Sequence, residues 1–126
     1  MRVLVIDDSE AIRAVLRRFL TPEGFDVVEA ADGAAAIECL TKDQKIDVAL
    51  IDWKMPRMNG YDWVKAVRQD PIHKNMILVM VTSEMQTSEV KKAMDAGVNE
   101  YIMKPFTRDM ILQKMNALRV SVKKSS

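Results

Sequence analysis

Residues 48–63, VALIDWKMPRMNGYDW, carry the clearest indication of the fold. The first four are apolar, which predicts a strand buried on both faces, as in a parallel sheet. Asp52 follows this strand directly and opens a loop that contains Pro56. The pair Asn59-Gly60 could close a two-residue hairpin, but the residues after it keep helical spacing. We therefore expect a strand, a loop that begins with a carboxylate, and then a helix.

The rest of the chain repeats this alternation of short apolar runs with helical patterns. Strands are predicted at residues 3–6, 26–28, 48–51, 76–81 and 101–103. Apolar residues at helical spacing predict helices around residues 12–19, 32–42, 64–67, 90–94 and 111–118. Strands that alternate with helices form a parallel sheet linked by right-handed crossovers. The sequence therefore predicts the α/β class, a doubly wound five-stranded parallel sheet with helices on both faces.

The length and charge of the chain limit its organisation and its partners. A chain of 126 residues is typical of one domain, and we expect that domain over residues 1–120, with 121–126 as a short polar tail. The 19 basic and 18 acidic residues nearly cancel, which argues against a surface for nucleic acid or for an anionic membrane. A single cysteine, Cys39, excludes an internal disulfide, and no signal peptide is apparent, so we expect a cytoplasmic protein.

Polar residues follow four of the five predicted strands. Asp7 and Asp8 follow the first, Asp52 the third, Thr82 the fourth and Lys104 the fifth. In a parallel sheet these strand ends share one edge, where ligands bind. Three adjoining carboxylates repel by about 4 kcal/mol per pair at 4 Å, which a hard divalent cation such as Mg²⁺ would offset. The alternative is that each residue is only a polar cap at a strand end.

Four segments together make the sequence similar to a known family. They are IDDS (6–9), LIDWKMPRMNG (50–60), MVTSE (80–84) and YIMKPFT (101–107). In these segments the chain resembles a response-regulator receiver domain of the chemotaxis type, and the resemblance extends from the first residue to about residue 120. It implies a flavodoxin-like fold with five helices and the strand order 2-1-3-4-5.

The resemblance also implies a phosphorylation site. Asp52 would be the phosphoacceptor, Asp8 a direct ligand of Mg²⁺, and Asp7 a carboxylate that reaches the metal mainly through water. The carboxylate of Asp52 and the backbone carbonyl of Lys54 would be further ligands, and Mn²⁺ is the alternative ion. Lys104, followed by a cis proline bond, would hold the phosphoryl oxygens.

A switch and a set of partners follow from the same resemblance. Thr82 would bond to the phosphoryl group, and Tyr101 would move inward in response. The phosphoryl donor would be a sensor histidine kinase or a phosphotransfer domain. A downstream target would bind the face formed by the fourth helix, fifth strand and fifth helix. We expect no nucleic-acid or membrane partner, and a monomer or a transient dimer.

Several functions remain open at this stage. Because only SVKKSS follows the last predicted helix, we expect a single-domain response regulator, in chemotaxis, that is not an enzyme beyond assisting its own phosphotransfer and dephosphorylation. The alternatives are a receiver excised from a longer regulator, and a relay protein in cell-cycle or developmental signalling. A hydrolase that uses Asp52 as its nucleophile is a further alternative, from a different functional class. A nucleotide-binding enzyme is disfavoured because no glycine-rich phosphate loop is present.

The chain contains ten methionines, and most of them continue the apolar periodicity. We expect them to pack in the core rather than to form an adaptable binding surface. The six that this expectation concerns are Met76, Met80, Met94, Met103, Met110 and Met115.

Overall fold

The computed structural model describes residues 1–41, 45–53, 60–83 and 87–125, and these contain one parallel five-stranded sheet. The strand order is β2-β1-β3-β4-β5. The strands are β1 (Arg2–Ile6), β2 (Asp26–Ala30), β3 (Val48–Asp52), β4 (Ile77–Thr82) and β5 (Glu100–Met103). This arrangement confirms the doubly wound α/β class and the predicted strand order.

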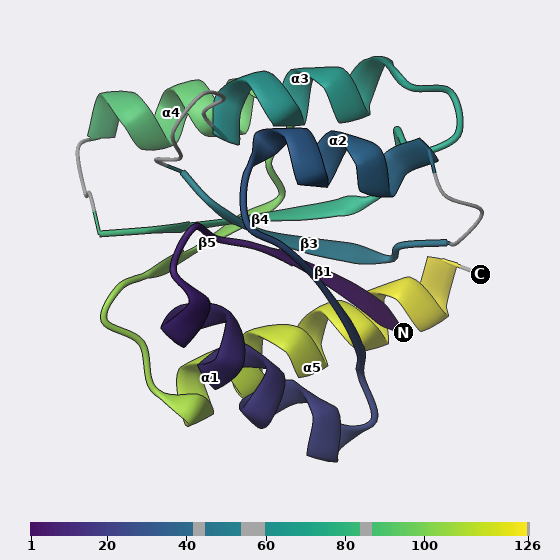
Figure 1. Ribbon diagram of the computed structural model, residues 1–126. Helices are drawn as coiled ribbons and strands as arrows, with labels where there is room; N and C mark the ends of the chain where they lie inside the picture. Colours follow the sequence, from purple (N-terminus) through teal and green to yellow (C-terminus); the bar gives the residue numbers. More distant parts are fainter. Residues whose placement is uncertain (42–44, 54–59, 84–86, 126) are drawn as a thin grey trace.

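Helices cover both faces of the sheet. In Figure 1, α2, α3 and α4 lie on one face and α1 and α5 on the other. The α-helices of the described chain are α1 (Glu10–Leu20), α2 (Gly33–Thr41), α3 (Gly60–Gln69), α4 (Thr87–Ala96) and α5 (Arg108–Ser125). A 3-10 turn, η1 (Thr21–Glu23), follows α1. The last helix thus continues into residues 121–125, and the division of the chain into a domain and a polar tail stays a prediction.

Local signals in the sequence set the ends of the helices that flank the site. The Ser9 hydroxyl accepts a hydrogen bond of 3.2 Å from the Ile12 amide and caps α1. Gly60 begins α3, so the hairpin alternative is excluded. A Cβ at Gly60 would lie 2.7 Å from Cε3 of Trp53, a distance that no side chain tolerates. Glycine therefore lets α3 start directly against the residue that follows Asp52.

The alternation of side chains along β3 builds both halves of the core. All five residues of β3 are buried. Ala49 and Ile51 belong to the cluster under α2, α3 and α4, whereas Val48 and Leu50 belong to the cluster under α1 and α5. Successive side chains of a strand point to opposite faces, so the part of β3 that helices cover on both sides, residues 48–51, is apolar.

The expectation for the methionines holds in part. Met76, Met80 and Met115 are buried, but Met94 is 38% exposed and Met110 is 39% exposed. Met110 lies in the first turn of α5. For these two residues the prediction of core packing was wrong, because helical spacing alone does not tell how far a covered face extends.

No helix of the described ranges combines the length and the apolar character needed to cross a membrane.

The turn after α3 gives the fold a pH-dependent contact. The Asp70 carboxylate accepts a hydrogen bond of 2.9 Å from the Ile72 amide and lies 3.1 Å from Nδ1 of the buried His73. The bond from Ile72, followed by that with His73, lowers the pKa of Asp70 below its ordinary 3.8. A carboxylate whose pKa is lower in the folded chain stabilises the fold above its unfolded pKa, and this contribution is lost as the pH falls through the folded pKa.

We therefore expect Asp70→Asn to be less stable than the parent chain at neutral pH, with a difference that shrinks below about pH 4. Urea unfolding of both chains between pH 7 and pH 3 measures this. A difference that stays constant over the whole range would show that the charge of Asp70 contributes nothing.

Candidate functional site

The parallel register brings the predicted polar residues to one edge of the sheet. Asp7 comes directly after Ile6, which is paired with Ile51, the neighbour of Asp52. Asp52 is in turn paired with Val81, and Thr82 follows on β4. Asp7 is 2% exposed, Thr82 3% and Asp52 9%. Three polar side chains from three strands are therefore buried side by side at the carboxyl ends of the strands.

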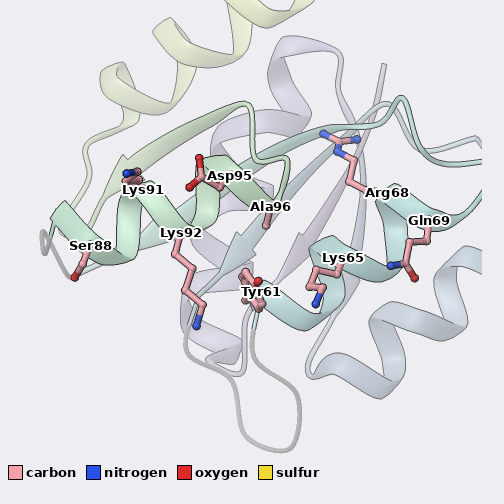
Figure 2. A pocket seen from close by; sticks show the side chains of 9 residues that line it. All are labelled: Tyr61, Lys65, Arg68, Gln69, Ser88, Lys91, Lys92, Asp95 and Ala96. Atoms are coloured by element: carbon pink, nitrogen blue, oxygen red, sulfur yellow. The ribbon is translucent and has the colours of Figure 1, made fainter.

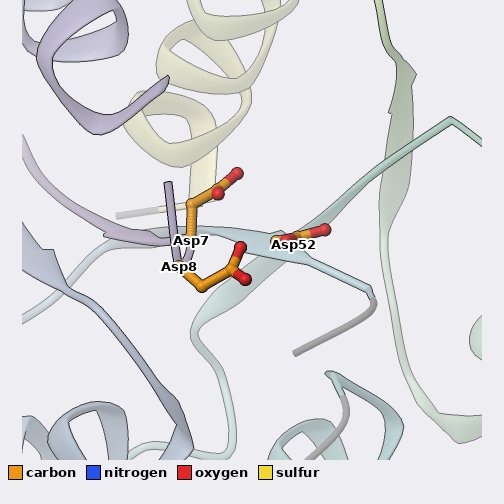
Figure 3. Close-up of side chains that lie close together, drawn as sticks. All are labelled: Asp7, Asp8 and Asp52. Atoms are coloured by element: carbon orange, nitrogen blue, oxygen red, sulfur yellow. The ribbon is translucent and has the colours of Figure 1, made fainter. Parts of the chain in front are cut away.

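The three aspartates form a compact acidic cluster. Asp7, Asp8 and Asp52 each offer a carboxylate oxygen, and these oxygens all lie within 4.8 Å of one another. Figure 3 shows the side chain of Asp8 extending toward Asp52, with Asp7 beside it. Carboxylate oxygens at such spacing suit a hard divalent cation. The chemistry of this donor set therefore fits Mg²⁺.

Lys104 supplies the positive charge next to the cluster. Its Nζ lies 3.0 Å from Oδ2 of Asp7 and 3.5 Å from Oδ1 of Asp52. Its backbone amide donates a hydrogen bond of 2.8 Å to the carbonyl of Thr82, which fixes the start of the loop after β5. The Lys104–Pro105 peptide bond is cis, as the resemblance implied. The ammonium group thus bridges two carboxylates from different strands.

The two carboxylates after β1 differ in their surroundings. Asp7 is engaged at both oxygens, because Oδ1 accepts a hydrogen bond of 2.9 Å from the Ser9 amide and Oδ2 faces Lys104. Asp8 is exposed. Asp8 is therefore the more accessible carboxylate for a metal ion, and the roles of the two aspartates as ligands stay a prediction.

Arg13 is a neighbour of the site that the sequence did not indicate. Its guanidinium donates a hydrogen bond of 2.7 Å to the backbone carbonyl of Asp7 and another of 3.2 Å to Glu29 on β2. These bonds tie α1 and β2 to the backbone of the acidic cluster. The only signal in the sequence is an arginine four residues after the Ser9 cap, which is too common to be informative.

The remaining predicted residues have different outcomes. Thr82 lies at the end of β4, one residue beyond the partner of Asp52. Tyr101 is half-buried on β5, is paired with Met80 and packs against the core. Lys54, whose backbone carbonyl was the predicted further ligand, lies outside the described residues. The structure therefore brings together Asp7, Asp8, Asp52 and Lys104 and leaves the part of Lys54 a prediction.

Comparison with known families gives one match that covers nearly the whole chain. Residues 3–116 match the family model described as the response regulator receiver domain. A chemotaxis protein CheY homolog of Campylobacter jejuni is 43% identical over 91% of this chain and 89% of its own length. Chemotaxis protein CheY1 of Helicobacter pylori is 41% identical over 94% of this chain and 96% of its own length.

Solved structures agree with the sequence relatives. Chemotaxis response regulator CheY4 of Vibrio cholerae superposes with a TM-score of 0.87 at 31% identity, over 93% of this chain and 97% of that one. A CheY-like response regulator receiver domain protein from Methanospirillum hungatei superposes with a TM-score of 0.91 at 26% identity, over 99% of this chain and 98% of that one.

Proposed function

The chain belongs to the family of response regulator receiver domains, and from this we propose that Asp52 accepts a phosphoryl group from a phosphorylated histidine. The observation that carries the proposal is the position of Lys104, whose Nζ lies 3.5 Å from Asp52 and 3.0 Å from Asp7. An ammonium group in this place can hold the oxygens of an incoming phosphoryl group next to the Asp52 carboxylate.

The proposed step is a direct transfer. An Asp52 oxygen forms a bond to phosphorus while the bond from phosphorus to the donor imidazole nitrogen breaks. The electron pair of that bond stays on the imidazole, which takes up a proton from water. When bound, Mg²⁺ would supply positive charge to the phosphoryl oxygens. Asp8, Asp7 and Asp52 would hold the ion, with the carbonyl of Lys54 as a further ligand and Mn²⁺ as the alternative ion.

Phosphorylation of Asp52 would then act on β4 and β5. Three new oxygens next to β4 would attract the hydroxyl of Thr82, and this shift would make room for Tyr101 to turn inward. Tyr101 is half-buried and packs against the core cluster, so an inward turn of its ring would change the surface near α4 and α5. We propose this face as the binding surface for a downstream target.

The pathway that we propose is chemotaxis, which the names of the Campylobacter jejuni and Helicobacter pylori relatives support. The family match over residues 3–116 supports a receiver domain over about residues 1–120. A sensor histidine kinase or a phosphotransfer domain would be the donor. A relay protein in another signalling pathway would have the same site, and the identity of the target distinguishes the two.

Intact-protein mass spectrometry after incubation with acetyl phosphate and Mg²⁺ tests the proposal. We expect the mass of one phosphoryl group on the parent chain and on Asp109→Asn, an exposed carboxylate on α5, but none on Asp52→Asn. The hydrolase alternative predicts many phosphates released per chain without a modified protein. A modified Asp52→Asn chain would overturn the assignment of the acceptor.

A further inference from the structure

A groove between α3 and α4 lies outside the acidic site. Its volume is about 600 Å³, and the residues on its walls recur at helical spacing on the facing sides of the two helices (Figure 2). From α3 they are Tyr61, Lys65, Arg68 and Gln69, and from α4 they are Ser88, Lys91, Lys92, Asp95 and Ala96.

The groove concentrates positive charge. Its walls carry four basic side chains and one acidic side chain, a formal charge of +3, whereas the whole chain carries only +1. The rest of the chain is therefore acidic on balance. Two helices that pack together usually place apolar or oppositely charged residues on their facing sides, because like charges there repel. The excess of cations is thus not explained by the packing of α3 on α4.

Two of the cations converge on one aromatic ring. Nζ of Lys92 lies 4.6 Å from the centroid of the Tyr61 ring, and Nζ of Lys65 lies 5.3 Å from it. Figure 2 shows the two lysines, from different helices, extending on either side of Tyr61. The negative face of the ring attracts each ammonium by about 0.5–1 kcal/mol at an exposed site. The ring therefore holds two like charges near each other at the groove wall.

Arg68 differs from the lysines because its guanidinium already has protein partners. It donates two hydrogen bonds to the carbonyl of Gly97 and one each to the carbonyls of Lys74 and Met76. The exposed lysines are consequently the groups that can bind a ligand in this groove. An ammonium is a compact point charge and lacks the planar fork with which arginine binds phosphate in a bidentate manner.

We propose that this groove binds an acidic segment of a partner protein, whose Asp or Glu carboxylates contact Lys65 and Lys92 on the two sides of the Tyr61 ring. The Tyr61 ring has already positioned both ammonium groups, so little side-chain conformational freedom would be lost when carboxylates bind them. The open groove along two helices accommodates an extended peptide. The proposal concerns the α3 side of α4 and does not depend on phosphorylation of Asp52.

Nucleic acid fits the groove less well than an acidic peptide. Binding of a phosphate backbone needs a long basic surface, but outside the groove the chain is acidic on balance. Stacking of a base needs an open aromatic face, and the ring of Tyr61 has a lysine on either side.

Fluorescence anisotropy with the full chain tests the proposal. The probe is a short fluorescein-labelled peptide of Glu, Asp and Gly, compared with the same peptide carrying Gln and Asn. We expect only the acidic peptide to bind, with an affinity that falls as NaCl is added. The double variant Lys65→Glu with Lys92→Glu should raise its Kd by at least about 10-fold. Both lysines are exposed, so the fold should be retained, which a thermal melt checks.

The matched control reverses two exposed charges elsewhere, Arg18→Glu on α1 with Lys45→Glu before β3. We expect it to change the Kd by less than about 2-fold. An equal loss in both double variants would mean that diffuse charge, and not the groove, binds the peptide. The proposal would also be overturned if inorganic phosphate or a single-stranded oligonucleotide displaced the labelled peptide at a lower concentration than the unlabelled acidic peptide does. The Lys65→Glu, Lys92→Glu variant should still accept a phosphoryl group from acetyl phosphate. A failure of the groove proposal can therefore be told apart from a failure of the Asp52 proposal.

Discussion

Replacing Asp8 by asparagine is expected to weaken Mg²⁺ binding by at least about 100-fold, because Asp8 is the proposed direct ligand and loss of an outer-shell partner alone costs about 10- to 100-fold. Asp7 has both oxygens engaged, by the Ser9 amide and by Lys104, so it cannot easily replace the lost ligand. Calorimetric titration with Mg²⁺ measures the change. Asp109→Asn, which removes the same charge from an exposed position on α5, should bind Mg²⁺ like the parent chain.

The same substitution is expected to stabilise the chain when no metal is present. Three carboxylate oxygens lie within 4.8 Å of one another, and Lys104 is the ammonium group that faces the cluster. Because Asp8 is exposed, water screens much of its repulsion, and we expect a gain of about 1 kcal/mol in the free energy of unfolding. Urea unfolding in EDTA measures it. A variant that is less stable without metal, or that still binds Mg²⁺ as well as the parent chain, would contradict the proposed role of Asp8.

Replacing Arg68 by methionine is expected to destabilise the fold by about 3 kcal/mol, since several hydrogen bonds from a charged donor are lost together. The guanidinium joins α3 to the segment before β4 through the carbonyls of Lys74 and Met76. It also reaches the turn between α4 and β5 through the carbonyl of Gly97 and, at 2.9 Å, through Oδ1 of Asn99. Burial lowers the pKa of Arg68, but arginine remains charged at neutral pH.

Thermal unfolding measures the effect of Arg68→Met, and we expect the melting temperature to fall by about 10 °C. Arg18→Met removes an exposed arginine from α1 and should change the stability by less than about 0.5 kcal/mol. Equal stability of the two variants would show that water replaces the Arg68 guanidinium at all of these carbonyls. Gly97 has φ 117°, and a Cβ there would lie 2.8 Å from Nε of Arg68, so this turn and the arginine depend on each other.

Much of the fold could be predicted from the sequence because its signals are local. A strand such as residues 48–51 carries apolar side chains on both faces when both faces are covered. This is typical of a parallel sheet between two layers of helices. Ser9 marks the start of α1 through its hydroxyl, which caps the helix. Gly60 was expected in the loop before a helix, whereas it is the first residue of α3. The strand ends were predicted less well, above all for the second strand, expected at residues 26–28 and observed as Asp26–Ala30, since end residues depend on pairing with a neighbouring strand.

The acidic site could also be anticipated, because carboxylates that end parallel strands must share an edge. The different surroundings of Asp7 and Asp8 could not, because they result from the Ser9 amide and Lys104, and Lys104 is 97 residues distant from Asp7 in the sequence. The bond from Arg13 to the Asp7 carbonyl likewise needs the path of α1 in space.

The sequence by itself determined the class of fold, the edge at which the site lies and the types of residue in it, since these follow from periodicity and from residue chemistry. Only the tertiary structure decided which charges meet. The position of Lys65 and Lys92 around Tyr61, and of Arg68 among backbone carbonyls, depends on how α3 packs beside α4 and the β4–β5 region. The physical reason is that charge interactions weaken with distance, whereas Lys92 lies 31 positions from Tyr61 and Gly97 lies 29 positions from Arg68 along the chain.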